Sequence, residues 1–228
     1  MSVIENHYES LLASRYTWMM GGAEQCAANA RSLLDAARLS ACESAGIALD
    51  LGSGPGYHAK ALAQRGFRVI AVDVSESCLQ ELRADCAGLN VETILGELTD
   101  PTTYSRQGPF TAILCVGDTL THLSSTDDVN RLLHTSFDLL APNGVLLLDF
   151  REQPVDAKNT IFTTRAERDR IMQCMLQLEP ARVWVTDIVH EWTGDRWTTI
   201  QSTYPKLRLS GDEIRMGRRT LALEKPGR

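Results

Sequence analysis

A glycine-rich turn between an apolar run and a predicted helix would bring backbone close to a ligand. The turn carries Gly52, Gly54 and Gly56, which have no Cβ to hold a ligand away. Asp73 follows the last of these glycines by seventeen residues and ends a second apolar run. In a parallel α/β sheet such an acid lies beside the turn, within reach of a ribose diol. The pattern predicts a nucleotide-binding site.

The spacing around the turn indicates which nucleotide would fit. A dinucleotide fingerprint needs glycine or alanine three positions after the second glycine, and Tyr57 stands there. Asp50 precedes the first glycine by two residues. A carboxylate beside the turn favours an ammonium over a pyrophosphate, because like charges repel. No Gly-Lys-Ser/Thr follows, which excludes a Walker-type phosphate site.

Two motifs resemble the class I S-adenosylmethionine-dependent methyltransferases, namely Leu49-Asp-Leu-Gly-Ser-Gly-Pro-Gly56 and Val72-Asp-Val-Ser75. The resemblance implies S-adenosylmethionine as cofactor and S-adenosylhomocysteine as product, with the turn under the methionine and Asp73 on the ribose. The alternative is the glycine-rich turn of any other α/β protein. The cofactor-binding residues predicted in this way are Tyr8, Tyr16, Trp18, Asp50, Gly52, Ser53, Gly54, Gly56, Asp73, Val74, Glu97, Leu98, Cys115, Val116 and Gly117.

Some of these positions keep alternative interpretations. Glu97 follows the third predicted strand, where the family contacts adenine, and it is otherwise an exposed loop acid. Tyr8, Tyr16 and Trp18 resemble aromatics of a lid, with Trp18 as a candidate cation–π partner for an ammonium or sulfonium. Hydrophobic anchoring of the lid is their alternative role.

The predicted catalytic residues are Asp118, His122 and Arg151. The first two follow the fourth strand, whose end resembles the motif that borders sulfonium and acceptor in small-molecule methyltransferases. His122 is placed to take a proton near neutral pH, unless it is structural. Asp118 would face the acceptor or cap the next turn.

Arg151 belongs to Leu148-Asp-Phe-Arg151, which is similar to the Asp-x-Arg of glycine and sarcosine N-methyltransferase-like enzymes. In those relatives the arginine binds the acceptor carboxylate, which a planar guanidinium grips with two hydrogen bonds. Its alternative partners are the nearby acids Glu152 and Glu191.

Alternating predicted strands and helices position these residues. Apolar spacing predicts helices over 5–40, divided at Gly21-Gly22. The fold class is α/β, with a Rossmann-like, mostly parallel sheet that has helices on both faces. Its predicted strands and helices are Ile47–Leu51, His58–Arg65, Arg68–Val74, Glu76–Cys86, Val91–Leu95, Phe110–Val116, Asp127–Leu140 and Val145–Phe150, with Pro142-Asn-Gly144 as the turn into the last strand.

A C-terminal antiparallel β insert follows this core. Its predicted strands are Ile171–Leu178, which a helix could replace, Arg182–Trp192 and Trp197–Leu209. One further strand fits at Arg219–Glu224, so either the sixth strand of the family is absent or part of the natural chain lies outside this sequence. We expect one domain over 1–228, with a helical lid (1–46), a cofactor-binding core (47–151) and strands over the substrate side (152–228).

Composition narrows the function classes. The net charge of −6 argues against a nucleic-acid partner, and Arg215-Met-Gly-Arg-Arg219 is better explained as a solvated strand edge. The histidines and cysteines lack metal-ligand spacing, and no apolar run approaches a membrane span. We expect a cytoplasmic protein, monomeric or homodimeric. The cysteines predicted to be reduced are Cys26, Cys42, Cys78, Cys86, Cys115 and Cys174.

The sequence predicts methyl transfer to a small-molecule acceptor, with an amine or a carboxylate-bearing metabolite preferred. An O-methyltransferase and a catalytically inactive cofactor-binding scaffold are the alternatives. A nicotinamide-dependent reductase is disfavoured by Tyr57.

Overall fold

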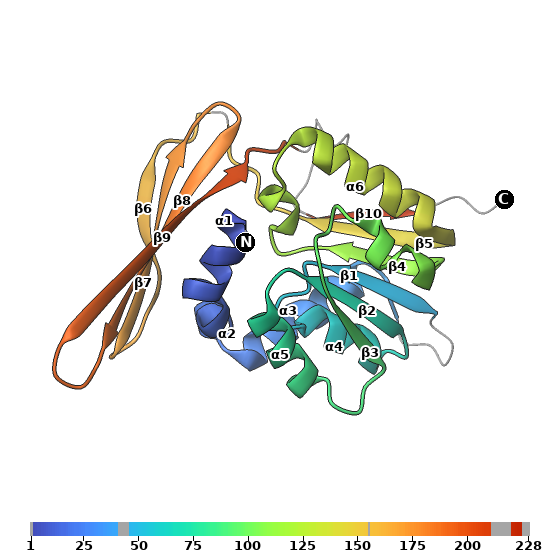
Figure 1. Ribbon diagram of the computed structural model, residues 1–228, viewed down its shortest axis with the longest axis horizontal. Coiled ribbons are helices and arrows are strands. Elements are labelled where there is room, and N and C mark those ends of the chain that lie inside the picture. Colours follow the sequence, from blue (N-terminus) through green and yellow to red (C-terminus); the bar gives the residue numbers. More distant parts are fainter. Residues whose placement is uncertain (1, 41–45, 155, 211–219, 225–228) are drawn as a thin grey trace.

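The chain folds around two β-sheets with short helices between them (Figure 1). The computed structural model describes residues 2–40, 46–154, 156–210 and 220–224. Two features of the sequence lie outside these ranges, namely Cys42 and the basic run Arg215-Met-Gly-Arg-Arg219.

The larger sheet has six strands in the order β10-β5-β4-β1-β2-β3. All are parallel except β10, which pairs antiparallel with β5 and supplies the sixth strand that the sequence left in doubt. The Rossmann-like fold class is therefore confirmed. The strands are β1 (Ile47–Leu51), β2 (Arg68–Asp73), β3 (Val91–Leu95), β4 (Phe110–Cys115), β5 (Leu140–Asp149) and β10 (Thr220–Glu224).

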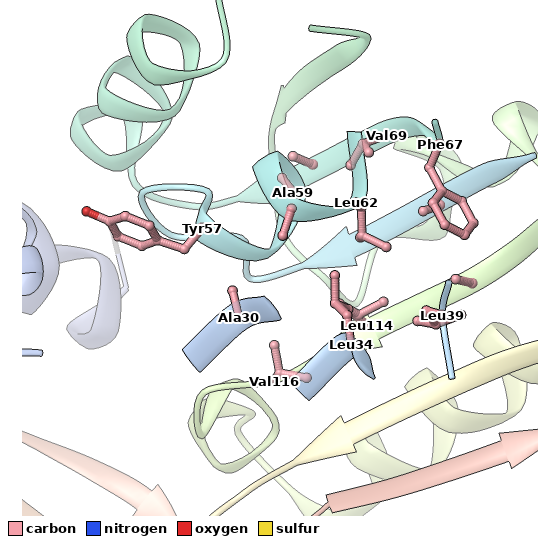
Figure 2. Close-up of a cluster of buried hydrophobic side chains, with 14 of the residues drawn as sticks. Ala30, Leu34, Leu39, Tyr57, Ala59, Leu62, Phe67, Val69, Leu114 and Val116 are labelled. Atoms are coloured by element: carbon pink, nitrogen blue, oxygen red, sulfur yellow. The ribbon is translucent and has the colours of Figure 1, made fainter. Parts of the chain in front are cut away.

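Helices cover both faces of this sheet because its strands are apolar on both sides. In β2, Val69 and Ala71 pack under α3 (Ala23–Ala36), α4 (Tyr57–Gln64) and α5 (Glu76–Asp85), as Figure 2 shows for part of this cluster. Ile70 and Val72 face the opposite side, under α6 (Thr126–Leu139). Short 3-10 segments complete that side, namely η3 (Pro101–Thr103), η4 (Ser105–Gln107) and η5 (Thr119–His122).

Side-chain caps fix where two of these helices begin. Ser75 accepts a hydrogen bond from the Cys78 N–H ahead of α5. Ser125 does the same for α6 through the Asp128 N–H. The predicted turn Pro142-Asn-Gly144 instead lies within β5, where the register with β4 shifts. β5 therefore starts earlier than the sequence predicted.

The first part of the lid, residues 3–19, consists of four consecutive short helical segments. They are α1 (Val3–His7), the π-helix η1 (Tyr8–Leu12), the 3-10 segment η2 (Ala13–Arg15) and α2 (Tyr16–Met19). Gly21 and Gly22 then take φ values of +104° and +96° and break the helix before α3, as predicted. Figure 1 places α1 and α2 between the two sheets.

The smaller sheet is antiparallel, in the order β6-β7-β8-β9. Its strands are β6 (Thr160–Ala166), β7 (Arg170–Leu178), β8 (Arg182–Trp192) and β9 (Trp197–Leu207). β7 is a strand, so its helical alternative is wrong, and β6 was not predicted. One face of this sheet packs on the lid, where Met172 and Val189 contact Leu11 and Leu12.

The described ranges contain neither a candidate membrane-spanning helix nor a candidate metal site. None of their helices is both long and apolar enough to cross a bilayer. They also contain no group of three or more histidine, cysteine, aspartate or glutamate side chains placed to hold a metal ion.

Candidate functional site

A cavity of about 420 Å³ lies between the lid and the carboxyl ends of the parallel strands. Ligands of open α/β sheets bind at this edge. Twelve of the residues predicted to bind cofactor or acceptor line it, and we call it the first cavity. They are Tyr8, Tyr16, Gly52, Ser53, Gly54, Asp73, Val74, Glu97, Leu98, Val116, Gly117 and His122.

The glycine turn forms the floor of the first cavity, but its glycines have different functions. Gly54 has φ +53° and open space where a Cβ would point. At Gly56, by contrast, a Cβ would lie 2.3 Å from Leu82 Cγ, so this glycine allows α4 to start against α5. Gly56 does not line the cavity, which corrects the expectation that all three glycines approach a ligand.

Asp73 lies at the end of β2 and faces the first cavity. Its Oδ2 accepts a hydrogen bond from the Gly54 N–H at 2.7 Å, and its Oδ1 accepts one from the Ser75 N–H at 2.9 Å. Burial raises the pKa of this carboxyl, and the backbone donors oppose the rise. The acid is thus fixed beside the turn, as the spacing predicted.

Asp50 is buried behind the turn, with 1% of its surface exposed, and does not line the cavity. Burial, and then the nearby charge of Asp73, raise the pKa of Asp50 to about 7. Its contribution to a ligand would therefore be electrostatic and indirect. Cys115 is likewise buried outside the cavity, next to Val116, which lines it.

The first cavity is suited to a positively charged ligand. Three acids line it, Asp73, Glu97 and Asp128. No lysine or arginine of residues 2–40, 46–154 or 156–210 does so. A pyrophosphate would meet only like charge here, whereas an ammonium or sulfonium would be attracted.

A second cavity of about 470 Å³ adjoins the first. It lies between the lid, the ends of β4 and β5, and one face of the smaller sheet. The two cavities share five lining residues, which we call the junction. The junction consists of Tyr8, Tyr16, Met20, Gly117 and His122.

Asp118 and Arg151 meet in the second cavity, together with a residue that the sequence did not indicate. Lys206 Nζ lies 3.2 Å from Asp118 Oδ2. The backbone N–H of Arg151 donates a hydrogen bond to Asp118 Oδ1. Burial would raise the pKa of Asp118, but the Lys206 and Arg151 cations hold it below its usual value. The carboxylate therefore stays ionised.

The side-chain cap considered for Asp118 is absent, whereas Arg151 does pair with a nearby acid, namely Asp118 itself. The Asp118 side chain binds Lys206 and the Arg151 backbone instead of capping the next turn. Arg151 Nε lies 3.9 Å from Asp118 Oδ2, while Glu191 pairs with Arg15 and Arg170. The Arg151 side chain is 63% exposed, so most of its guanidinium is accessible.

His122 lies at the junction between aromatic rings. Its ring stacks on Tyr204 at 5.6 Å and meets Tyr8 edge-on at 5.9 Å. Burial, with Lys206 adding to it, lowers the pKa of His122 well below its usual value. The imidazole is therefore neutral at physiological pH. Its Nδ1 has no hydrogen-bond partner within the described ranges.

Trp18 lines neither cavity. The guanidinium carbons of Arg165 and Arg170 lie 5.7 Å and 5.1 Å from its ring centroid. Its cation–π partners are thus arginines of the smaller sheet, so Trp18 is placed to join the lid to that sheet. This corrects its predicted contact with a cofactor.

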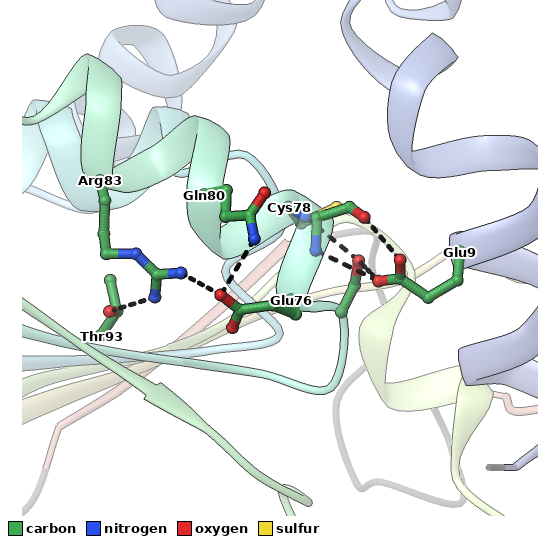
Figure 3. A network of polar contacts seen from close by, with 8 residues as sticks. Glu9, Glu76, Cys78, Gln80, Arg83 and Thr93 are labelled. Carbon is green, nitrogen blue, oxygen red and sulfur yellow. Dashed lines mark hydrogen bonds and ion pairs between the residues drawn. The ribbon is translucent and has the colours of Figure 1, made fainter.

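Hydrogen bonds hold the lid closed over the first cavity. Glu9 accepts from the Ser75 hydroxyl at 2.6 Å and from the Ser77 N–H and hydroxyl, at the start of α5 (Figure 3). Thr17 bonds to the Tyr57 hydroxyl at 2.8 Å and donates to Glu81. Tyr57, at the position of the missing dinucleotide glycine, therefore anchors the lid.

A comparison with known protein families finds a match for the core of the chain. Residues 48–144 match a family model described as a methyltransferase domain. This part of the chain is therefore a methyltransferase domain. The match spans β1 to β5 and therefore includes the glycine turn, Asp73 and the junction residues Gly117 and His122.

Individual proteins are also similar in sequence to part of this chain. A glycine/sarcosine N-methyltransferase of Parasynechococcus marenigrum is 31% identical over 106 residues, 45% of this chain and 37% of that protein. The chain spans at most 39% of the first three relatives of this kind that it matches.

Two solved structures share the fold over nearly the whole chain. A methyltransferase of Clostridium acetobutylicum has a TM-score of 0.73 at 14% identity and covers 98% of both chains. The sugar N-methyltransferase KedS8 of a Streptoalloteichus species has a TM-score of 0.71 at 13% identity, over 95% of this chain and 93% of its own.

Four residues beside the methyltransferase site were not predicted. Lys206 and Tyr204 come from β9, Asp187 from β8 and His7 from the lid. All but His7 line the second cavity. The alternation of Tyr204 with Lys206 along one strand would have indicated a shared face, but only strand pairing shows which cavity that face meets.

Proposed function

We propose that this protein transfers a methyl group from S-adenosylmethionine to an amine of a small molecule. The observation that carries the proposal is the junction, where an acid-lined cavity at a glycine turn meets a second cavity of similar volume. Such a junction would bring a methyl donor bound in the first cavity into contact with an acceptor bound in the second. In this proposal the lid lies within 1–46, the cofactor-binding core is 47–151, and the smaller sheet within 152–228 covers the acceptor. Two elements depart from this division, because α3 covers a face of the larger sheet and β10 is one of its strands.

The residues of the first cavity fit this cofactor. Asp73, which lines this cavity, would accept hydrogen bonds from the ribose hydroxyls, and Glu97 and Leu98 would border the adenine. The open backbone at Gly54 leaves room for the methionine part, and the acids balance its ammonium and sulfonium charges. When bound, S-adenosylmethionine supplies a methyl group activated on sulfur, whose leaving group is neutral.

The residues of the second cavity would prepare the acceptor. A neutral amine is the nucleophile, and the neutral His122 ring could accept a hydrogen bond from it, although its lowered pKa makes the ring a weak base. Tyr8 and Tyr16 close the junction from the lid side and keep water from it. Arg151, with its exposed guanidinium, remains our candidate for an acceptor carboxylate.

The names of the similar proteins support an amine acceptor. A glycine/sarcosine N-methyltransferase and a sugar N-methyltransferase both act on nitrogen by name. An O-methyltransferase is the second candidate, since His122 would equally serve a hydroxyl acceptor.

Calorimetric titration followed by a methylation assay tests the proposal. We expect S-adenosylmethionine and S-adenosylhomocysteine to bind, and NADH not to bind. We also expect methyl transfer from methyl-labelled S-adenosylmethionine to members of a panel of primary amines, and not to alcohols of the same carbon skeleton. Binding without transfer to any amine would favour a scaffold protein. Tight binding of NADH would contradict the cofactor assignment.

A further inference from the structure

The second cavity is large for a glycine-like acceptor. Its volume of about 470 Å³ falls in the range of pockets that enclose drug-sized ligands. Glycine carries no side chain and would leave most of this space empty. One wall of this cavity is the face of the smaller sheet on which Leu176, Val183 and Val185 lie. An acceptor that fills the cavity therefore has a body as well as a reacting nitrogen.

One carboxylate interrupts this apolar wall. Asp187 lies in β8, opposite Cys174 of β7 and Ser202 of β9, and lines the cavity. Its side chain is 6% exposed. A carboxylate is costly to bury unless donors surround it, so its partners decide what it can do.

The partners of Asp187 occupy only one of its oxygens. The Tyr204 hydroxyl donates to Oδ2 at 3.3 Å, and His7 Nε2 lies 3.3 Å from the same atom. The His7 ring lies 4.0 Å from the Tyr204 ring and is fully buried. Within the described ranges, no nitrogen or hydroxyl group donates to Oδ1. The Cys174 thiol also interacts with the Asp187 carboxylate. A carboxylate has about four lone-pair sites, so an acceptor group could still donate here.

Asp187 differs in this respect from Asp118, the other acid discussed in this cavity. Asp118 binds Lys206 and the Arg151 backbone through separate oxygens. Its charge is therefore compensated by the chain itself. Of these two acids, Asp187 is the one with an oxygen left for a ligand.

We propose that Asp187 determines acceptor specificity by binding a hydroxyl or amino group on the acceptor body, away from the nitrogen that is methylated. The acceptor class is thus an amine that carries a second hydrogen-bond donor, and not a simple alkylamine or glycine. This inference rests on the proposed function. It adds a specificity residue and makes no change to the transfer step.

Matched pairs of amines test the inference. The probes are the 2-, 3- and 4-aminocyclohexanols, each compared with the methylcyclohexylamine of the same substitution, which replaces the hydroxyl by a methyl group. We expect the wild-type protein to prefer at least one aminocyclohexanol by about ten-fold in kcat/KM, mainly through KM. Asp187→Asn and Asp187→Leu should remove most of this preference, measured in each variant as the ratio of kcat/KM values within a pair. Asp195→Asn, in the exposed β8–β9 turn, is the matched control.

Several results would overturn the inference. They are a wild-type protein without any preference, a preference that persists in both Asp187 variants, and equal loss of all substrates in properly folded variants. Calorimetric binding of the same pairs to protein saturated with S-adenosylhomocysteine separates this inference from the proposed function. If no amine is methylated, the proposed function fails, but a binding preference lost in Asp187→Asn would still identify Asp187 as the specificity residue.

Discussion

At the scale of single residues, Asp73 connects the glycine turn to the ligand site. Its carboxylate accepts from the Gly54 N–H and the Ser75 N–H, one on each side of the cavity floor. These bonds fix its orientation before any ligand binds, which lowers the entropic cost of binding. Asp73 also adds to the rise in the pKa of Asp50, so the two acids share one electrostatic environment.

We predict that Asp73→Ala weakens the binding of S-adenosylhomocysteine by about 1.5–3 kcal/mol, the range for losing hydrogen bonds to a charged group. Calorimetric titration measures this change, and thermal unfolding checks that the variant is folded. Asp85→Ala, at the exposed end of α5, is the matched control. An unchanged dissociation constant for Asp73→Ala would mean that the ribose lies elsewhere.

The sequence indicated many of the site residues and missed others for a physical reason. Gly52, Gly54 and Asp73 follow from local spacing, since the turn and the neighbouring strand end define the site. Asp187 and Lys206 reach the site through the pairing of strands far along the chain, which single residues do not reveal. Trp18 does make cation–π contacts, but with two arginines of the smaller sheet instead of a ligand.

At the scale of elements, the lid is held by polar contacts at the first turn of α5. The Glu9 carboxylate binds both Ser75 and Ser77 there, where the helix dipole favours a negative charge (Figure 3). Burial would raise the pKa of Glu9, but the hydrogen bonds that its carboxylate accepts from these serines lower it. Contacts of this kind can open and close, so the lid can release a ligand without unfolding.

We predict that Glu9→Gln speeds the release of S-adenosylhomocysteine a few-fold, because an exposed charge at a helix start contributes at most about 1 kcal/mol. Stopped-flow displacement measures the rate. Glu24→Gln, an exposed acid in the first turn of α3, should leave it unchanged. Equal release rates in wild type and Glu9→Gln would show that this contact does not limit opening.

Most elements of the core were predictable, and those outside it less so. Continuous apolar runs and the serine before α5 locate the parallel strands and that helix. β6 was missed because its positions 160–166 are almost entirely exposed and give no clean alternation of apolar and polar residues. The first part of the lid reads as one helix, but packing between two sheets divides it into short pieces.

At the scale of the whole molecule, the stability of the fold should depend on the state of Asp50. Burial and Asp73 raise its pKa to about 7 in the folded chain, against about 3.9 when unfolded. Between these two values the folded state binds more protons than the unfolded state. The free energy of unfolding therefore decreases as the pH rises through this window.

We predict that Asp50→Asn, whose side chain cannot ionise, removes this decrease in the free energy of unfolding with rising pH. The melting temperature of the variant relative to wild type should rise between pH 4.5 and pH 8, as measured by scanning calorimetry without ligand. Asp138→Asn, an exposed acid of α6, should show no such rise. A constant difference between Asp50→Asn and wild type across this range would contradict the raised pKa.

Donor and acceptor should meet at the junction of the two cavities, and a crystal structure with bound S-adenosylhomocysteine tests this most directly. We predict that the ribose hydroxyls bind Asp73 and that the thioether sulfur lies at the junction, next to Gly117 and His122 and open to the second cavity. A ligand bound with its sulfur turned away from the second cavity, or with its ribose away from Asp73, would contradict the account.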